Sequence, residues 1–315
     1  MPDDDPHEQQ LIDVLIDACP AVHEALAIGP GDDAAWVREG RVITADTMVE
    51  GVHWDARLSP EDVGWKLVAV NASDLGAMGA RPRWAVLSLA LPDPADLDWV
   101  RAFSRGLALG LRHFGMDLAG GDTVRAGDTN TVATLTAGGE ARHPVRRSGG
   151  QPGHLVFVTG ALGGAAGGLI SDKPGLLEAL ARPAPPVRFG VALGESGIVR
   201  AMMDLSDGLA ADLPRLCQAS QCGARIDATA IPMHPDLPKR ARRLTLTGGE
   251  DYELLFTVEE QDVDQLLPLA RGHNVQITQI GHLSEGRGPT LLDGSWPNPD
   301  FAHFERLETE DEGAA

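Results

Sequence analysis

The sequence predicts an α/β protein of two domains, and three observations support this. The chain has 315 residues, about twice the usual length of one domain. Amphipathic helical patterns alternate along it with short apolar, β-branched runs that are typical of strands. The segment 143–153 (H-P-V-R-R-S-G-G-Q-P-G) has the Pro and Gly content of a domain junction. We therefore expect domains at 8–148 and 149–305, flanked by flexible tails at 1–7 and 306–315.

The composition is that of a globular protein with a sizeable core and an acidic surface. Hydrophobic residues make up 43% of the chain and charged residues 23%, and the formal net charge is −20. Nucleic-acid binders present a basic face to the phosphate backbone, so this charge argues against a nucleic-acid partner. An acidic enzyme that handles anionic substrates would need metal ions to mask its charge, although net charge also serves solubility alone.

Several features favour a cytoplasmic protein without a membrane partner. The three cysteines (Cys19, Cys217 and Cys222) are too few for a disulfide framework, and none lies in a C-x-x-C pair. The first residues, M-P-D-D-D-P-H-E, are acidic where a signal peptide is basic. No apolar run approaches the length of a membrane span.

The clearest element of the first half is a helix that begins after Ser59. Serine is a preferred N-cap, Pro60 suits the first helical position, and Asp62 lies where a capping box places its carboxylate. The sequence that follows is almost all apolar or small, which predicts a helix buried on most sides. Periodicity predicts the other elements of this half: helices 8–19 and 93–114, and strands 41–44, 83–91, 117–119 and 130–137.

In the second half, strands and helices again follow one another. Segment 160–168 (G-A-L-G-G-A-A-G-G) fits neither G-x-x-x-x-G-K-[ST] nor G-x-G-x-x-G, so we favour a closely packed helix start over a phosphate site there. The remaining predicted elements are strands 154–159, 201–204, 254–258 and 275–280, and helices 209–217 and 261–271.

Five acidic stretches share one format, in which a short apolar strand and a small or glycine-rich turn lead to a carboxylate. They are G-D-D (Asp32, Asp33), T-A-D (Asp46), G-G-D-T (Asp122), D-L-S-D-G (Asp204, Asp207) and G-G-E-D (Glu250, Asp251). Strand ends converge on one edge of a sheet, so residues far apart in sequence can share a site. Crowded carboxylates repel unless a cation lies among them, and Mg²⁺ prefers oxygen ligands. The pattern predicts two or more Mg²⁺ ions that bridge a polyphosphate.

Three further residues have both a structural and a functional interpretation. Asp74 interrupts the buried helix, so it either caps a local group or reaches a metal. A single histidine such as His53 is more often structural, but it lies seven residues beyond Asp46, where a substrate phosphate would explain it. Arg147 in the junction segment is either solvated or clamps a triphosphate.

Two other kinds of site are excluded by spacing. D-L-S-D-G lacks the internal spacing of an EF-hand loop and the glutamate that ends one. No G-x-S-x-G is present, so a Ser-His-Asp hydrolase is not supported.

Taken together, these motifs resemble the thiamine-monophosphate kinase family, one of the aminoimidazole-ribonucleotide-synthetase-like ATP-binding proteins. The resemblance covers residues 11–304 and rests on motifs in matching order, among them T-A-D-T-M-V-E-G-V-H-W, V-N-A-S-D-L-G-A-M-G-A, G-G-D-T, R-S-G, D-L-S-D-G and G-G-E-D-Y-E-L. It implies a two-domain α/β architecture. The first domain would carry a sheet that forms a barrel with its counterpart in a homodimer, and the second would be an α/β sandwich.

The resemblance also implies a reaction and the residues that serve it. ATP and thiamine monophosphate would give ADP and thiamine diphosphate, with a cluster of Mg²⁺ ions around Asp46 and Asp207 in place of a dedicated base. The implied metal ligands are Asp33, Thr44, Asp46, Asp74, Asp122, Asp204 and Asp207. The implied contacts to ATP are Gly121, Asp122, Arg147 and Ser206, and those to thiamine monophosphate are His53, Glu250 and Phe301.

The chain departs from the family pattern at two places that bear on the site. Ala45 stands where relatives often have Thr, so only its backbone carbonyl could reach a metal. A nucleotide-contacting Tyr of some relatives falls near Ser104 and Arg105 and has no counterpart. The alternatives are another ATP-using member of the superfamily, such as an aminoimidazole ribonucleotide synthetase, and a non-catalytic scaffold that binds divalent cations.

Overall fold

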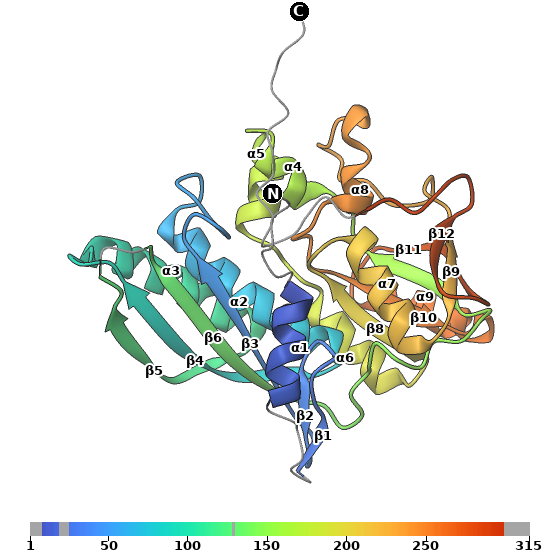
Figure 1. Ribbon diagram of the computed structural model, residues 1–315, viewed down its shortest axis with the longest axis horizontal. Coiled ribbons are helices and arrows are strands. Elements are labelled where there is room, and N and C mark those ends of the chain that lie inside the picture. The colour runs from blue at the N-terminus through green and yellow to red at the C-terminus, as the bar shows by residue number, and fades with distance from the viewer. Residues whose placement is uncertain (1–7, 19–24, 128–129, 299–315) are drawn as a thin grey trace, which may run out of the picture.

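In the computed structural model, which describes residues 8–18, 25–127 and 130–298, the chain folds around two six-stranded sheets. The first sheet has the order β1-β2-β3-β6-β4-β5 and the second β12-β9-β11-β7-β10-β8 (Figure 1). The strands of the first are β1 Leu26–Ile28, β2 Ala35–Val37, β3 Arg41–Val49, β4 Arg81–Leu91, β5 Asp117–Arg125 and β6 Val132–Glu140. Those of the second are β7 Leu155–Thr159, β8 Val199–Leu205, β9 Gly223–Ile226, β10 Glu253–Val258, β11 Ile277–Ser284 and β12 Gly288–Leu291.

Two long helices cover one face of the first sheet. They are α2 Pro60–Ala77 and α3 Leu97–Phe114. The predicted capping box is present, because the Ser59 hydroxyl accepts from the Asp62 amide and the Asp62 carboxylate accepts from the Ser59 amide. The two helices approach so closely that a Cβ on Gly64 would lie 2.2 Å from the Phe103 carbonyl oxygen, so this position has no room for a side chain. Helix α2 also contacts α6 and β8, and therefore lies between the two sheets (Figure 1).

The second sheet is covered on both faces, which confirms the expected α/β sandwich. Alternate residues of a strand point to opposite faces. Val156 and Val158 of β7 pack in a core with α7 (Leu209–Ser220), whereas Phe157 packs with α6 (Val187–Ser196) and α9 (Val263–Gly272). The remaining helices described are α1 Glu8–Ala18, α4 Gly164–Leu169, α5 Pro174–Ala181 and α8 Leu244–Thr247.

Two acidic stretches predicted as turns are strand interiors instead. Strand β3 continues through Asp46 to Val49, because β6 pairs with it along all nine residues. Strand β5 likewise continues through Gly121 and Asp122 to Arg125, paired in parallel with β4. A Cβ on Gly121 would lie 2.2 Å from the Leu87 carbonyl oxygen, so this glycine permits strand pairing rather than a turn.

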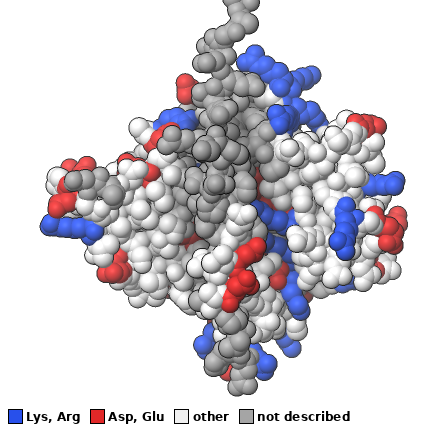
Figure 2. Space-filling model, viewed as in Figure 1, with Lys and Arg blue, Asp and Glu red and all other residues white. Residues whose placement is uncertain are grey.

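The other differences are smaller. The third helix begins at Leu97 with Asp96 as its N-cap, rather than at Asp93. The apolar residues before G-G-E-D form the helical turn α8 and not a strand. No helix among the described residues is long and apolar enough to cross a membrane. On the face drawn in Figure 2, basic and acidic side chains lie in small separate groups.

Candidate active site

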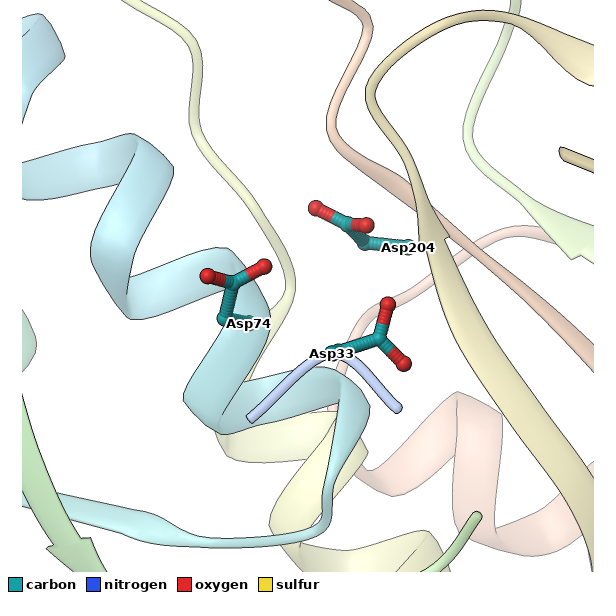
Figure 3. Close-up of side chains that lie close together, drawn as sticks. All are labelled: Asp33, Asp74 and Asp204. Atoms are coloured by element: carbon teal, nitrogen blue, oxygen red, sulfur yellow. The ribbon is translucent and has the colours of Figure 1, made fainter. Parts of the chain in front are cut away.

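Three of the predicted carboxylates meet where the two halves of the chain face each other. Asp33 lies in the loop between β1 and β2, Asp74 on α2 and Asp204 near the end of β8. One carboxylate oxygen of each lies within 4.8 Å of the others, and Figure 3 shows the side chains around a common space. The fold thus joins residues separated by up to 171 positions, since α2 packs against β8.

Burial and mutual repulsion govern the charge of this cluster, here called the aspartate cluster. Burial raises the pKa of Asp33, Asp74 and Asp204, and the neighbouring carboxylates raise it further, well above the usual value for Asp74 and Asp204. Asp33 Oδ2 is buried and accepts no hydrogen bond from the part of the chain that the structure describes. An orphaned carboxylate oxygen beside two more carboxylates fits the oxygen-rich shell that a hard divalent cation requires.

Neighbouring polar groups hold each carboxylate in place. The Thr44 hydroxyl donates to Asp74 Oδ2 (2.5 Å), and the Ser73 hydroxyl donates to Asp204 Oδ2 (2.7 Å). Arg147 donates through Nη2 to Asp33 Oδ1 (2.8 Å) and through its amide to Asp32 Oδ1 (2.7 Å). Burial disfavours the charged guanidinium, but the nearby aspartates outweigh this effect and raise the pKa of Arg147. Arg147 is therefore positively charged at the edge of the cluster.

A cavity of about 190 Å³ adjoins the aspartate cluster. Its lining contains acidic and polar side chains from both halves of the chain: Asp46, His53, Asp74, Asp204, Ser206, Asp207 and Glu250. A second, smaller hollow of about 70 Å³ shares His53 and Glu250 with it. The walls of this hollow are more apolar, with Val52, Trp54, Leu58, Leu169 and Leu180.

Two residues at the cavity have orientations set by the backbone. His53 Nδ1 accepts from the Val49 amide (2.9 Å), so in the neutral ring the proton lies on Nε2. Glu250 has a left-handed backbone with φ of 68°, and its amide donates to the Ser206 carbonyl (2.7 Å). These backbone contacts therefore restrict how the His53 and Glu250 side chains face the two hollows.

Asp207 belongs to a second ionic group. Arg215 of α7 contacts the carboxylates of both Asp207 and Asp212, and the Asp207 amide donates to Asp212 Oδ2 (3.1 Å). Burial and the neighbouring Asp207 raise the pKa of Asp212 to about 7, although Arg215 opposes this. The contacts among Asp207, Asp212 and Arg215 stabilise the turn between β8 and α7.

Some of the predicted site residues lie apart from the cavity in a single chain. Gly121 and Asp122 are on β5, an exposed edge strand separated from β3 by β4 and β6. Ala45 lies on the opposite face of β3 from Thr44 and Asp46. Phe301 lies outside the described residues, as do the two predicted tails.

The glycine-rich segment 160–168 packs closely, as the sequence predicts. The amides of Gly163 and Ala165 donate to the Asp251 carboxylate at 2.6 and 3.2 Å. Asp251 therefore occupies the position at the start of α4 where a phosphate would otherwise bind. Burial raises its pKa to about 7 despite these hydrogen bonds.

The structure adds residues that the motifs did not reveal. Lys66, Tyr252, Asp212 and Arg215 lie at or beside the cavity. Lys66 had a visible signal, because it is a lone charge in the apolar stretch W-K-L-V-A-V, and Tyr252 lies within the motif G-G-E-D-Y-E-L. The ion pairs of Asp212 and Arg215 become apparent only once α7 is packed.

The chain matches known proteins along most of its length. Residues 31–141 match the family model "AIR synthase related protein, N-terminal domain", and residues 151–294 match "AIR synthase related protein, C-terminal domain". Thiamine-monophosphate kinase of Haemophilus influenzae is 38% identical over 306 residues, covering 89% of this chain and 92% of the relative. The Escherichia coli K12 kinase of the same name is 38% identical over 278 residues, covering 82% and 84%.

Solved structures agree with these sequence matches. Thiamine-monophosphate kinase from Stenotrophomonas maltophilia superposes with a TM-score of 0.76 at 36% identity, covering 91% of this chain and 96% of that one. A structure described as "AaThiL complexed with AMPPCP and TMP" superposes with a TM-score of 0.80 at 28% identity, covering 92% and 96%. The chain belongs to the thiamine-monophosphate kinase family of the AIR synthase related proteins.

Proposed function

We propose that this chain transfers the γ-phosphoryl group of ATP to thiamine monophosphate and so forms thiamine diphosphate. The observation that carries the proposal is the aspartate cluster with its orphaned Asp33 oxygen, at the wall of a cavity that His53 and Glu250 also line. Structural likeness to a kinase complexed with AMPPCP and TMP supports both substrates.

We propose that the aspartate cluster holds Mg²⁺ together with Thr44, Asp46 and Asp207. All these groups offer the hard oxygen ligands that Mg²⁺ prefers, and substrate phosphates would complete the coordination. When bound, the ions would offset the charge of two anionic reactants. Asp207 lines the cavity, and Arg215 contacts one of its carboxylate oxygens and so restrains the side chain there.

The two hollows favour one orientation for thiamine monophosphate. The smaller hollow has the larger share of apolar lining, which suits the aromatic rings of thiamine, although Asp55 and Arg57 also line it. The larger hollow is acidic and adjoins the cluster. We place the rings in the smaller hollow, beside Glu250, and the phosphate in the larger one. The proton on His53 Nε2 can then be donated to a phosphate oxygen.

The reaction we propose is a direct in-line attack by a phosphate oxygen of thiamine monophosphate on the γ-phosphorus of ATP. Phosphoryl transfer depends chiefly on alignment and charge stabilisation. The attacking oxygen already belongs to an anion, so the residues must orient it rather than deprotonate it. Arg147, held at Asp33, and Ser206 at the cavity wall are positioned to orient the ATP phosphates. A single displacement inverts a chiral γ-phosphate, and retention of configuration would contradict it.

We further propose that two copies of the chain assemble through their first sheets. The outer edge of β3 is paired with β2 only over Arg41–Ile43, so among the described residues no strand pairs with its half from Thr44 to Val49. Within that half, the Asp46 amide donates to Asn71 Oδ1 (3.2 Å). The free edge of β5 exposes the apolar Leu118 and Val124. Pairing β5 of one copy with β3 of the other would give the backbone groups at both edges hydrogen-bond partners and would close a barrel.

This assembly would also account for Asp122. Across β6 and β4, Asp46 of β3 is in register with Gly121 of β5, and Asp122 is the next residue. The two strands are three strand spacings apart, or about 14 Å across the sheet. That separation is too large for one metal site within a chain. A second copy that pairs its β5 with β3 would bring its own Asp122 and Gly121 beside Asp46.

A coupled assay of ATP consumption tests the proposed function. We expect ADP to form only when thiamine monophosphate and Mg²⁺ are both present. Consumption with formylglycinamidine ribonucleotide instead would favour an aminoimidazole ribonucleotide synthetase, and metal binding without turnover would favour a scaffold. The buried free thiols of Cys217 and Cys222 suit the reducing cytoplasm, where we propose the enzyme acts.

A further inference from the structure

Lys66 is a charged residue inside the interface between the two halves of the chain. It lies on α2 with 1% of its side chain exposed, and its Nζ donates to Glu250 Oε2 at 2.9 Å. A longer contact of 3.4 Å joins Nζ to the His53 carbonyl. Lys66 thus connects, through one ammonium group, the two residues that we place beside thiamine monophosphate.

Packing alone does not explain a lysine at this position. Removing two charges from water costs several kcal/mol per ion before pairing, and well-packed apolar residues of similar volume often serve stability equally well. Of the 26 lysine and arginine residues in the chain, only three are lysines. A compact ammonium with three donors suits a point contact in a narrow space, whereas an arginine fork needs more room.

The partner of Lys66 is held in an uncommon conformation. The Glu250 backbone is left-handed, which is unfavourable for a residue with a side chain. The Glu250 side chain is only 5% exposed, and its Oε1 accepts no hydrogen bond from any described residue. One carboxylate oxygen is therefore bound by Lys66 while the other is available at the two hollows.

We infer that Lys66 is a positioning residue for thiamine monophosphate, which acts by holding the Glu250 carboxylate oriented toward the substrate. The inference rests on the proposed function. Thiamine has a cationic thiazolium ring and an amino group on its pyrimidine ring, and both interact favourably with an oriented carboxylate oxygen. With only 1% of its side chain exposed, Lys66 has almost no surface of its own for substrate, so it acts through Glu250.

The test is a double-mutant cycle of Lys66→Met and Glu250→Gln, read as separate KM values for the two substrates. We expect each single variant to raise the KM for thiamine monophosphate about tenfold, as loss of a charged hydrogen bond does. The KM for ATP should change by less than about twofold. If Lys66 acts through Glu250, adding Lys66→Met to Glu250→Gln should raise the KM by no more than about another twofold.

Lys173→Met serves as the matched control. Lys173 is exposed, donates to the Asp236 carbonyl (2.9 Å), and lines neither hollow, so this variant should keep wild-type constants. If Lys66→Met does not fold, Lys66→Gln replaces it in the same cycle. Its amide retains one donor, and the KM for thiamine monophosphate should still rise about threefold.

Independent, additive effects of the two substitutions would overturn the inference, as would equal changes in both KM values or an unchanged KM for thiamine monophosphate. A purely structural ion pair would lower stability and leave the KM of the folded enzyme unaltered. Failure of the wild-type protein to consume ATP in response to thiamine monophosphate would instead overturn the proposed function, and this inference with it.

Discussion

At the scale of single residues, the metal-binding role that we propose for the aspartate cluster conflicts with the stability of the fold. Asp33, Asp74 and Asp204 are buried near one another, and repulsion adds to burial in raising the pKa of each. A carboxylate with an elevated native pKa binds its proton more tightly when folded, so folding is disfavoured once pH exceeds the unfolded pKa. Without metal, the cluster therefore destabilises the fold at neutral pH.

Asp204→Asn should separate these two effects. The amide keeps an oxygen that can accept from Ser73 but removes one charge from the cluster. We expect the free energy of unfolding in EDTA at pH 8 to rise by about 0.5–2 kcal/mol, as is typical of a relieved functional site. Turnover at saturating Mg²⁺ should fall about 100-fold or more, because a charge that stabilises the transferring group is lost. Urea denaturation and the ATP assay measure the two quantities.

Asp264→Asn is the matched control, since Asp264 is exposed on α9 away from the cavity. It should alter neither stability in EDTA nor turnover appreciably. A loss of stability in Asp204→Asn without metal would show that the carboxylates do not repel one another as their spacing implies.

At the scale of elements, the sequence predicts best where local interactions decide the structure. The start of α2 followed from Ser59, Pro60 and Asp62 because a capping box involves only neighbours in sequence. The ends of β3 and β5 could not be predicted in this way. The length of β3 depends on its pairing with β6, and that of β5 on its pairing with β4, and both partners lie elsewhere in the chain. For the same reason, the motifs indicated Asp33, Asp74 and Asp204, whereas the pairing of Lys66 with a residue 184 positions away required the fold.

Strand β10 carries an element-scale prediction about pH. Burial raises the pKa of Glu253 from 4.5 to about 7, although the Thr159 hydroxyl donates to it. Between these values the folded state binds more protons than the unfolded state, so stability decreases as pH rises from about 4.5 to about 7. Because Glu253 is only half-buried as a residue, we expect this carboxyl to account for about 1–2 kcal/mol of the loss.

Glu253→Gln should remove that part of the pH dependence. The amide is uncharged at every pH and its oxygen still accepts from Thr159. Free energies of unfolding measured by urea at pH 5 and pH 8 should therefore differ less in the variant than in the wild type. Identical slopes in the two proteins would contradict a buried carboxyl with a raised pKa.

At the scale of the whole molecule, the proposed dimer can be tested at the two sheet edges that no other strand covers among the described residues, β5 and half of β3. Val124→Lys places a charge on β5, two residues from Asp122, where it would disfavour pairing with another strand. We expect this variant to be monomeric by light scattering and to lose activity while it keeps its fold. Leu267→Lys, which changes a similarly exposed apolar residue on α9, should remain a dimer with wild-type activity.

Mixing two inactive variants determines which copy supplies Asp122. Asp74→Asn and Asp122→Asn chains are each expected to be inactive alone. If Asp122 acts in the partner's site, a mixed dimer has one site with an intact Asp74 and an intact Asp122, and one site that lacks both. About half of the dimers in a re-equilibrated equal mixture are mixed, so activity should recover to about a quarter of wild type. If Asp122 acted within its own chain, every site in the mixture would lack one aspartate and no activity would return.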